Sequence, residues 1–265
     1  MYSPIQLAFK YIQHYLKASN GKGHGVHSPF VFQFIKEVIQ DDRSFYAFKD
    51  IEQIRTALLN NTKEITIEDF GAGSHTGLTK QRKISDIAKS SLKPKKFAQL
   101  LFKMVNYYQP KNILELGTSL GITTSYLASA NKNVQVTTME GSFTIAAIAK
   151  ENFTTLKLKN IEVVEGNFDT TLPTALSQLS TIDFAFLDGN HRYQPTINYF
   201  NQVLAKSNEY TIIILDDVHW SKQMEKALNE VKQHPQVTLT IDLFFIGIVL
   251  LRKEFKVKQH FVIRF

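Results

Sequence analysis

The chain has 265 residues, of which 43% are hydrophobic, and it contains no cysteine. The lack of thiols excludes disulfides and thiolate-bound metals and is consistent with a reducing compartment, so we expect a cytoplasmic protein. No apolar run reaches the roughly 18 residues of a membrane span, and Lys10, His14 and Lys17 interrupt the N-terminal segment, so neither a membrane helix nor a secretory signal is expected.

The formal net charge of +7 is unevenly distributed. Residues 1–111 carry 17 Lys and Arg against 9 Asp and Glu, whereas residues 112–265 carry 14 against 15. The excess is densest from Lys80 to Lys111, which holds nine basic residues and one acid. Such a run is either a solvated surface or a contact for an anionic partner, and we favour the solvated surface.

The N-terminal part is predicted to be mainly helical. Apolar residues recur there at helical spacing, and Ser28-Pro29 has the pattern of an N-cap followed by proline in the first helical turn. A short alternating strand leads into the glycine-containing segment Phe70–Ser74, which we interpret as a structural or substrate-side loop. The predicted elements are helices over 4–18, 28–39, 46–60 and 96–108 and a strand over 64–69.

From Asn112 onward, short apolar runs alternate with helical segments, which is typical of βαβ units and a parallel sheet. The last two runs, 237–244 and 245–252, are so close that only a tight antiparallel hairpin can join them. The sequence thus predicts an α/β domain over 96–265, preceded by a helical region over 1–95. The other predicted strands are 112–116, 134–139, 161–165, 182–187 and 210–216.

The strongest local motif is Ile113-Leu-Glu-Leu-Gly-Thr-Ser-Leu-Gly-Ile122, a buried strand that runs into two glycines and then a helix. Gly117 allows a tight turn, and Gly121 allows the backbone to approach a ligand. Its spacing lacks one glycine of the dinucleotide fingerprint G-x-G-x-x-G, which argues against a nicotinamide-dependent dehydrogenase. Thr118 and Ser119 fill the loop instead and suit a zwitterionic ligand without phosphate.

A second signal is Glu140, which ends a predicted strand 23 residues after Gly117. An acid about 20 residues beyond a glycine loop accepts hydrogen bonds from ribose hydroxyls in nucleotide-binding α/β folds. Glu140 is therefore predicted to bind a ribose; the alternative is an exposed acid at a strand end.

The stretch Glu115-Leu-Gly-Thr-Ser-Leu-Gly121 resembles the first motif of class I methyltransferases that use S-adenosylmethionine (SAM), specifically the small-molecule O-methyltransferases of the catechol and caffeoyl-CoA type. The resemblance covers about residues 95–252. It implies a Rossmann-like fold that binds SAM. Residues 1–95 would then form a lid that sets specificity. The residues implied in SAM binding are Glu115, Gly117, Thr118, Ser119 and Gly121 in the loop, Glu140 at the ribose, and Gly166 and Asn167 beside the adenine.

Acidic residues end two further predicted strands, Asp188 on one and Asp216 with Asp217 on the next. Because carboxyl ends of parallel strands meet at one sheet edge, these acids are expected to lie together, with Asp188 beside the cofactor. Carboxylates without thiolates suit Mg²⁺. Catechol-type enzymes have an acid–amide pair where this chain has two acids, so metal binding stays open; Asp188 and Asp217 can instead cap the following helices.

His191, three residues after Asp188, is the candidate general base because imidazole accepts a proton near neutral pH. The alternative is a hydrogen bond within its own loop. His219 is a weaker candidate for the same role.

These signals together predict methyl transfer from SAM to an oxygen of a small molecule, with Mg²⁺ as a further candidate cofactor. One rival is a nucleic-acid methyltransferase that uses the basic 80–111 segment, but Asp188-Gly-Asn-His stands where such enzymes carry an Asn/Asp-Pro-Pro-aromatic motif. Another rival is a non-catalytic SAM-binding module. The sequence leaves the oligomeric state open, a homodimer included.

Overall fold

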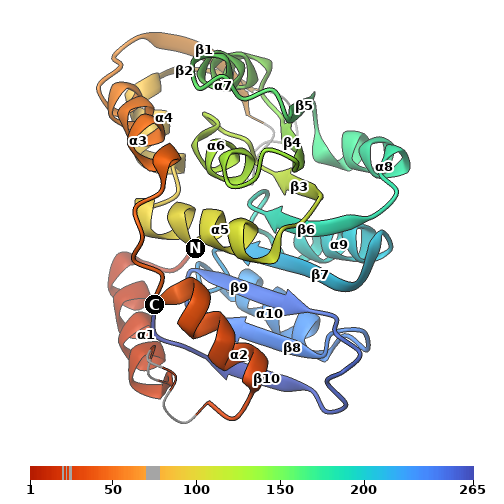
Figure 1. The fold of residues 1–265 in the computed structure, drawn as a ribbon. Helices are drawn as coiled ribbons and strands as arrows, with labels where there is room; N and C mark the ends of the chain where they lie inside the picture. Colours follow the sequence, from red (N-terminus) through yellow and green to blue (C-terminus); the bar gives the residue numbers. More distant parts are fainter. Residues whose placement is uncertain (20, 22, 24–25, 70–77) are drawn as a thin grey trace. The chain divides into compact units, whose positions relative to one another are not determined.

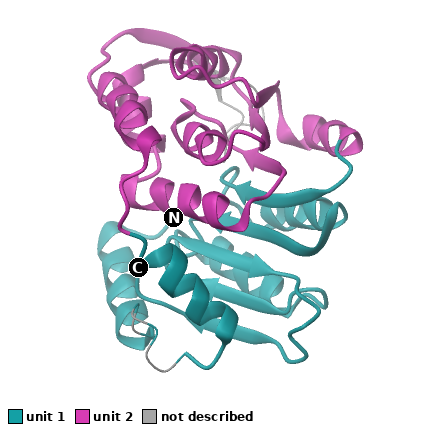
Figure 2. Cartoon of the chain, in the orientation of Figure 1, with its two compact units in different colours: residues 1–41, 179–265 teal, residues 42–178 magenta. Residues whose placement is uncertain are grey.

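The computed structural model divides the chain into two compact units (Figure 2). Unit 1 combines residues 1–41 with 179–265, and unit 2 is residues 42–178. The predicted loop Phe70–Ser74 lies outside the described residues. No helix within the described part of the chain is long and apolar enough to cross a membrane. The residues that the structure describes are 1–19, 21, 23, 26–69 and 78–265.

Unit 1 contains five adjacent strands in the order β10-β8-β9-β7-β6 (Figure 1). Strands β6 and β7 are parallel, whereas β9 runs antiparallel to both of its neighbours, β7 and β8. The predicted terminal hairpin is thereby confirmed. The strands are β6 (Ile182–Leu187), β7 (Ser207–Asp216), β8 (Leu239–Asp242), β9 (Ile246–Leu250) and β10 (Gln259–Val262), with helices α9 (Tyr193–Leu204) and α10 (Lys222–Gln233) between them.

Strand β10 was not predicted from the sequence. It has four residues and pairs in parallel with β8. The preceding segment, Arg252–Lys258, is rich in charge, and so short a strand after it has no alternating pattern of its own. Its position depends on the partner strand rather than on local sequence.

Both predicted N-terminal helices of unit 1 form, and the second starts at Pro29 as predicted, although the Ser28 side chain makes no capping hydrogen bond. Helix α1 (Pro4–Lys17) starts with a capping box in which the Ser3 side chain and the Gln6 side chain each bind the other residue's backbone N–H. The second predicted helix forms as α2 (Pro29–Phe34), with proline in its first turn, and continues as a π-helical turn, η1 (Ile35–Ile39).

Unit 2 contains three parallel strands in the order β3-β4-β5. Their register places Glu115 beside Thr138 and Glu140 beside Glu165. All eight residues of the first helix after β3 are buried, as expected for a helix in the interior of a fold. The strands are β3 (Asn112–Leu116), β4 (Gln135–Glu140) and β5 (Ile161–Glu165), and the helices that follow them are α6 (Ile122–Ser129), α7 (Phe143–Thr155) and α8 (Phe168–Gln178).

The remainder of unit 2 precedes this sheet. Helices α3 (Tyr46–Leu59) and α5 (Lys95–Tyr108) match predicted helices, whereas strand β2 (Leu78–Lys83) and helix α4 (Ile84–Ser91) were not predicted. Strand β2 pairs antiparallel with β1 (Glu64–Asp69), and the basic residues of its second half mask any apolar alternation. Much of the basic run thus belongs to ordinary secondary structure.

The predicted α/β class, with mostly parallel strands and an antiparallel strand in the last hairpin, is confirmed. The strand interiors are apolar and buried in both units, with Leu114 in β3 and Ile213 in β7 each fully buried. This burial holds the strand ends, where the candidate site residues lie, in fixed positions. The predicted division of roles between residues 1–95 and 96–265 stays a prediction.

Candidate functional site

The glycine loop of unit 2 is held by main-chain hydrogen bonds to the neighbouring strand. The N–H groups of Gly117 and Thr118 both donate to the Met139 carbonyl at 3.0 Å. Gly117 has a φ of 103° and Ser119 a φ of 47°, both in the left-handed region. The predicted need for glycine at the tight turn is explained by the first of these angles, which side chains rarely adopt.

Glu140, the predicted ribose ligand, lies directly beside this loop. Its Oε2 accepts the Ser119 N–H at 2.8 Å, and its Oε1 accepts the Ser142 N–H at 3.0 Å. Burial raises the pKa of Glu140 above its ordinary value, although these backbone hydrogen bonds act in the opposite direction. Each oxygen of a carboxylate has two lone pairs, so Glu140 retains acceptor capacity for two hydroxyl groups.

Glu115 is fully buried at the end of β3 and is bound by two threonines. Its Oε2 accepts hydrogen bonds from Thr124 Oγ1 at 2.5 Å and from Thr138 Oγ1 at 2.6 Å. Thr138 Oγ1 also lies 2.6 Å from Thr118 Oγ1. Thr124 and Thr138 were not singled out from the sequence. The signal that could have identified them is a polar residue inside an apolar strand or helix, because buried polar groups need partners.

Gly121 has a structural reason to be glycine. Its φ is 80°, and a Cβ at this position would lie 2.6 Å from the Phe153 ring of α7 and 3.1 Å from Ala149 Cβ. The sequence suggested that a ligand approaches the backbone of Gly121 closely. In the structure, helix α7 makes this close approach. A role of Gly121 in cofactor binding stays a prediction.

Gly166 and Asn167 follow β5, as their predicted adenine role requires. The Gly166 N–H donates to the Glu140 carbonyl at 2.8 Å, which ties this turn to the ribose acid. Asn167 Oδ1 accepts the Asp169 N–H at 2.9 Å and so caps α8. The adenine role of both residues remains a prediction.

Unit 1 brings Asp188, His191 and Asp216 together. One ligand atom from each of these side chains lies within 4.8 Å of those of the other two. His191 Nε2 is 3.4 Å from Asp188 Oδ1, and Asp216 is almost fully buried. Two carboxylates and an imidazole at these separations fit a divalent cation, and the imidazole makes Mn²⁺ a candidate alongside Mg²⁺.

Two further candidates in unit 1 are Asp217 and His219. Asp217, predicted as the third metal ligand, has a left-handed φ of 51°, and its carbonyl accepts the Trp220 N–H. Both ring nitrogens of His219 are engaged, Nε2 with Asp242 Oδ2 at 2.8 Å and Nδ1 with Glu225 Oε1 at 3.2 Å. This arrangement gives His219 a structural role.

Residues 114–218 match a family model described as a methyltransferase domain. This part of the chain is therefore similar to known methyltransferase domains. The match includes the glycine loop, Glu140 and the group formed by Asp188, His191 and Asp216. The resemblance to methyltransferases that the sequence motifs indicated is therefore confirmed.

Two relatives match part of the chain. A catechol O-methyltransferase of Niastella koreensis is 33% identical over 126 residues, which are 46% of this chain and 55% of that protein. An uncharacterized protein of Acanthamoeba polyphaga mimivirus is 42% identical over 53 residues, 19% of this chain and 24% of that protein. The chain thus matches at most about half the length of these relatives.

Solved methyltransferases share the fold along most of the chain. An O-methyltransferase from Bacillus cereus in complex with SAH is 21% identical, with a TM-score of 0.57 over 83% of this chain and 97% of that chain. The SAH-bound methyltransferase PaMTH1 of Podospora anserina is 13% identical, with a TM-score of 0.59, and the match covers 96% of this chain and 98% of that chain. At these identities the likeness establishes the fold alone.

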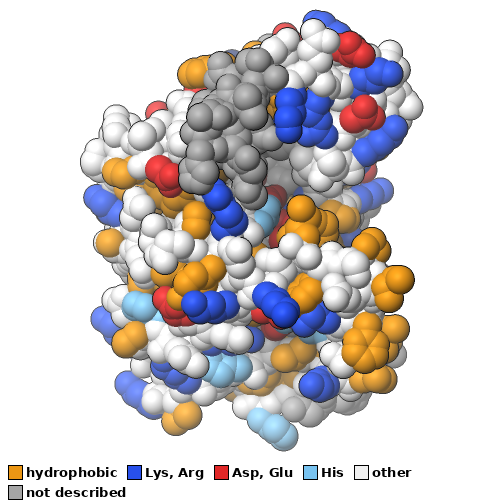
Figure 3. Space-filling view, turned by 180° about the vertical axis from the view of Figure 1, so that it is seen from behind, with side chains coloured by type: hydrophobic (Ala, Val, Ile, Leu, Met, Phe, Trp, Pro, Cys, Tyr) orange, Lys and Arg blue, Asp and Glu red, His pale blue; other side chains and the backbone are white. Residues whose placement is uncertain are grey.

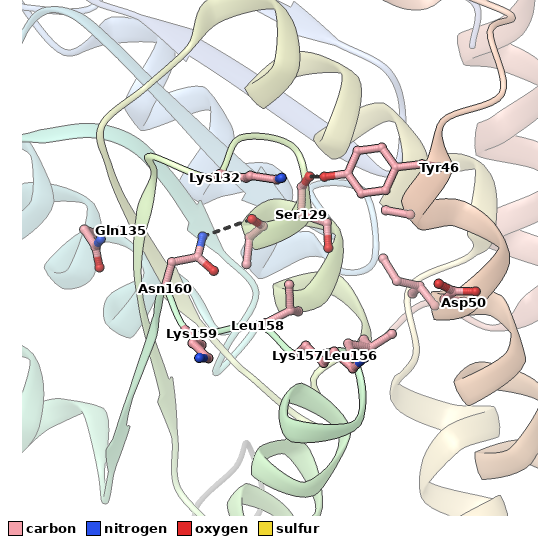
Figure 4. A pocket seen from close by; sticks show the side chains of 13 residues that line it. Tyr46, Asp50, Ser129, Lys132, Gln135, Leu156, Lys157, Leu158, Lys159 and Asn160 are labelled. Atoms are coloured by element: carbon pink, nitrogen blue, oxygen red, sulfur yellow. Dashed lines mark hydrogen bonds between the residues drawn. The ribbon is translucent and has the colours of Figure 1, made fainter.

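A cavity of about 480 Å³ in unit 2 lies away from the candidate site residues (Figure 4). Tyr46 closes one side by donating to the Ser129 carbonyl at 2.6 Å. Gln135, which also lines it, is the first residue of β4, and Asn160 immediately precedes β5. The cavity is thus at the amino ends of these strands, whereas Glu140 and Gly166 stand at or beyond their carboxyl ends. It contains none of the predicted site residues.

The sequence did not indicate Ser91, the last residue of α4, as a neighbour of the cofactor loop. Its Oγ lies 2.8 Å from Ser119 Oγ. No local pattern could have revealed this contact, because the two residues are 28 positions apart and α4 itself was not predicted.

Proposed function

We propose that the protein is a SAM-dependent methyltransferase that methylates an oxygen of a small molecule. The methyltransferase domain supports the reaction class, and the names of the catechol and Bacillus cereus O-methyltransferases support oxygen as the acceptor atom. The observation that carries the proposal is the position of Glu140 against the glycine loop. That juxtaposition is the ribose site of a nucleoside-containing ligand, made without the second glycine of a dinucleotide fold.

The residues present fit SAM. Glu140 would hold the ribose hydroxyls, the loop from Gly117 to Ser119 would face the amino acid moiety, and Gly166 with Asn167 would border the adenine. Glu115 would take part beneath the loop, where two threonines hold its carboxylate. When bound, SAM supplies a methyl group on a sulfonium, which is an excellent leaving group. The protein's task is then to orient the acceptor and remove its proton.

Asp188, His191 and Asp216 of unit 1 are proposed to orient the acceptor and remove its proton. Asp188 and Asp216 would hold a divalent cation, with Asp217 as the third ligand that the sequence predicts. Such a cation would lower the pKa of an acceptor hydroxyl. His191 would accept the hydroxyl proton, since Asp188 lies 3.4 Å from its Nε2 and can orient the ring. The geometry offers His191 a second role as the third cation ligand.

The decisive test measures transfer of labelled methyl groups from SAM to a panel of small hydroxylated aromatic acceptors, including catechols. We expect turnover with at least one acceptor in the wild type. The His191→Gln variant should lose activity while keeping the wild-type affinity for SAM, and Asp188→Asn should lose activity as well. If His191→Gln also abolishes the effect of added Mn²⁺ on thermal stability, His191 is a ligand rather than the base.

Two outcomes would overturn the proposal. Methylation of RNA or DNA with a steep salt dependence, and none of small acceptors, would favour the nucleic-acid alternative. Tight SAM binding without turnover of any acceptor would favour the non-catalytic module.

A further inference from the structure

Helix α1 turns its polar side toward the protein and its apolar side toward solvent. Its hydrophobic residues follow a helical period, yet the helix contributes no fully buried residue. An amphipathic surface helix normally buries its apolar stripe against the core. The reversed arrangement of α1 therefore needs a physical explanation.

The inward side of α1 is held by charged and aromatic contacts within unit 1. Lys10 Nζ lies 2.8 Å from Glu225 Oε1, and His14 Nε2 lies 3.3 Å from Asp242 Oδ1. The ring centroid of Tyr11 is 5.0 Å from that of Phe244 in an edge-to-face contact. Because these groups hold the helix by its polar side, it cannot roll to bury its apolar stripe without breaking them.

The outward side is a continuous apolar stripe made of Ile5, Phe9, Ile12 and Leu16. Their exposed fractions are 83%, 61%, 55% and 72%, respectively. The spacing i, i+4, i+7, i+11 places all four on one side of the helix. In the space-filling view, hydrophobic side chains stand out along the right margin of the lower half, where α1 lies after the half-turn (Figure 3). Contiguous apolar patches of this kind mark interaction sites.

We propose that this stripe binds the same stripe of a second copy of the chain, with the two α1 helices antiparallel across a two-fold axis. The four positions are symmetric about the midpoint between residues 10 and 11. An antiparallel pair therefore sets Ile5 opposite Leu16 of the other copy and Phe9 opposite Ile12. Such self-complementarity is what a two-fold interface requires, because one patch must serve both sides.

The charges of α1 fit this occupant better than a membrane surface. The stripe contains no charged residue, so two copies meet without like-charge repulsion. Gln6 and Gln13 lie beside it, and amides can both donate and accept across a symmetric contact. A membrane-surface helix is rich in Lys and Arg on a solvated polar side, whereas α1 exposes one lysine, Lys17 in its last turn, and its other lysine, Lys10, is ion-paired with Glu225 on the side that packs on the protein.

The first test is the mass of the full chain by light scattering over a range of concentrations. We expect a dimer for the wild type and a monomer for Phe9→Ser/Ile12→Ser, with an unchanged circular dichroism spectrum. The matched control is Val257→Ser, which alters a side chain of unit 1 that is 74% exposed and lies outside the stripe, and it should remain dimeric. A monomeric wild type, or a dimer that survives the double substitution, would overturn the proposal.

The second test exploits the absence of cysteine from the chain. A mixture of Phe9→Cys and Ile12→Cys chains should oxidise mainly to the mixed 9–12 disulfide dimer if the helices are antiparallel. Predominant 9–9 and 12–12 dimers would reject the antiparallel arrangement. Flotation of the wild type with phosphatidylcholine–phosphatidylglycerol vesicles, lost in Phe9→Ser/Ile12→Ser, would replace the second copy by a lipid surface as the occupant.

Discussion

The candidate cofactor site of unit 2 and the acidic group of unit 1 are built in different ways. In unit 2, backbone N–H groups fix both oxygens of Glu140 at 2.8 and 3.0 Å. In unit 1, Asp188 and His191 are 3.4 Å apart, and the ligand atoms of the group spread over up to 4.8 Å. The first site is preorganised by the chain itself, whereas the second leaves room for an ion to complete it. SAM affinity should therefore depend on the residues of unit 2, and cation effects on those of unit 1.

The largest effect is expected from Glu140→Ala. The substitution removes the acceptor for two ribose hydroxyls, and hydrogen bonds to a charged group contribute about 1.5–3 kcal/mol each. We predict that the Kd for SAM rises roughly 100-fold or more, measured by titration calorimetry.

The control is Glu162→Ala, which removes an exposed carboxylate from the neighbouring strand β5. Its SAM affinity should equal that of the wild type. Equal affinities in all three proteins would show that Glu140 has no ligand and is only a cap for the loop.

The next effect concerns the cation. Mg²⁺ or Mn²⁺ added to protein treated with EDTA should raise the unfolding temperature, because an ion that binds only the folded state stabilises it by about 2.7 kcal/mol at one hundred times its Kd. The Asp216→Asn variant should lose this response, and Glu254→Gln, which alters an exposed carboxylate in unit 1, should keep it. If neither ion changes the unfolding temperature of the wild type, Asp188 and Asp216 have a structural role and do not bind a cation.

A smaller effect is expected from Gly121→Ala. The added Cβ would clash with Phe153, and the positive φ would be strained, so we expect a loss of about 2 kcal/mol of stability. This corresponds to a fall of about 4–8 °C in Tm. Combining it with Phe153→Leu should restore part of the loss. Unchanged stability in the single variant would contradict the packing role assigned to Gly121.

The smallest effect is a pH dependence of unit 1. Burial alone would lower the pKa of His219, but the hydrogen bonds and charges of Asp242 and Glu225 raise it above its ordinary value. The other charged groups nearby are Lys10, which pairs with Glu225, and His14 and Lys232, which pair with Asp242. A raised histidine pKa contributes stability that is complete below about pH 6.5 and is lost as the pH rises through the folded value.

We therefore predict that the Tm of the wild type falls by a few degrees between about pH 6 and about pH 9. The His219→Gln variant should show a weaker dependence over the same range. If both proteins have the same profile, the network around His219 does not stabilise unit 1.

Several parts of this protein were determined by its sequence. The strands between 112 and 252, the terminal hairpin, the start of α2 at Pro29 and the placement of Glu140 beside a glycine loop all depend on apolar periodicity and on residues at fixed short distances. Hydrophobic spacing selects helix or strand locally, and parallel strands bring their carboxyl ends to one edge.

Only the tertiary structure decided the remainder. The sequence predicted Asp188, Asp216 and Asp217 as metal ligands, and the fold brings His191 to Asp188 and Asp216. It also placed Ser91 at the cofactor loop, Phe153 against Gly121, and the apolar stripe of α1 outward. Each of these depends on contacts between residues distant in the chain, for which no local spacing carries information. Side-chain direction after a strand end depends on the φ and ψ angles of one or two loop residues, and these are set by packing rather than by residue type.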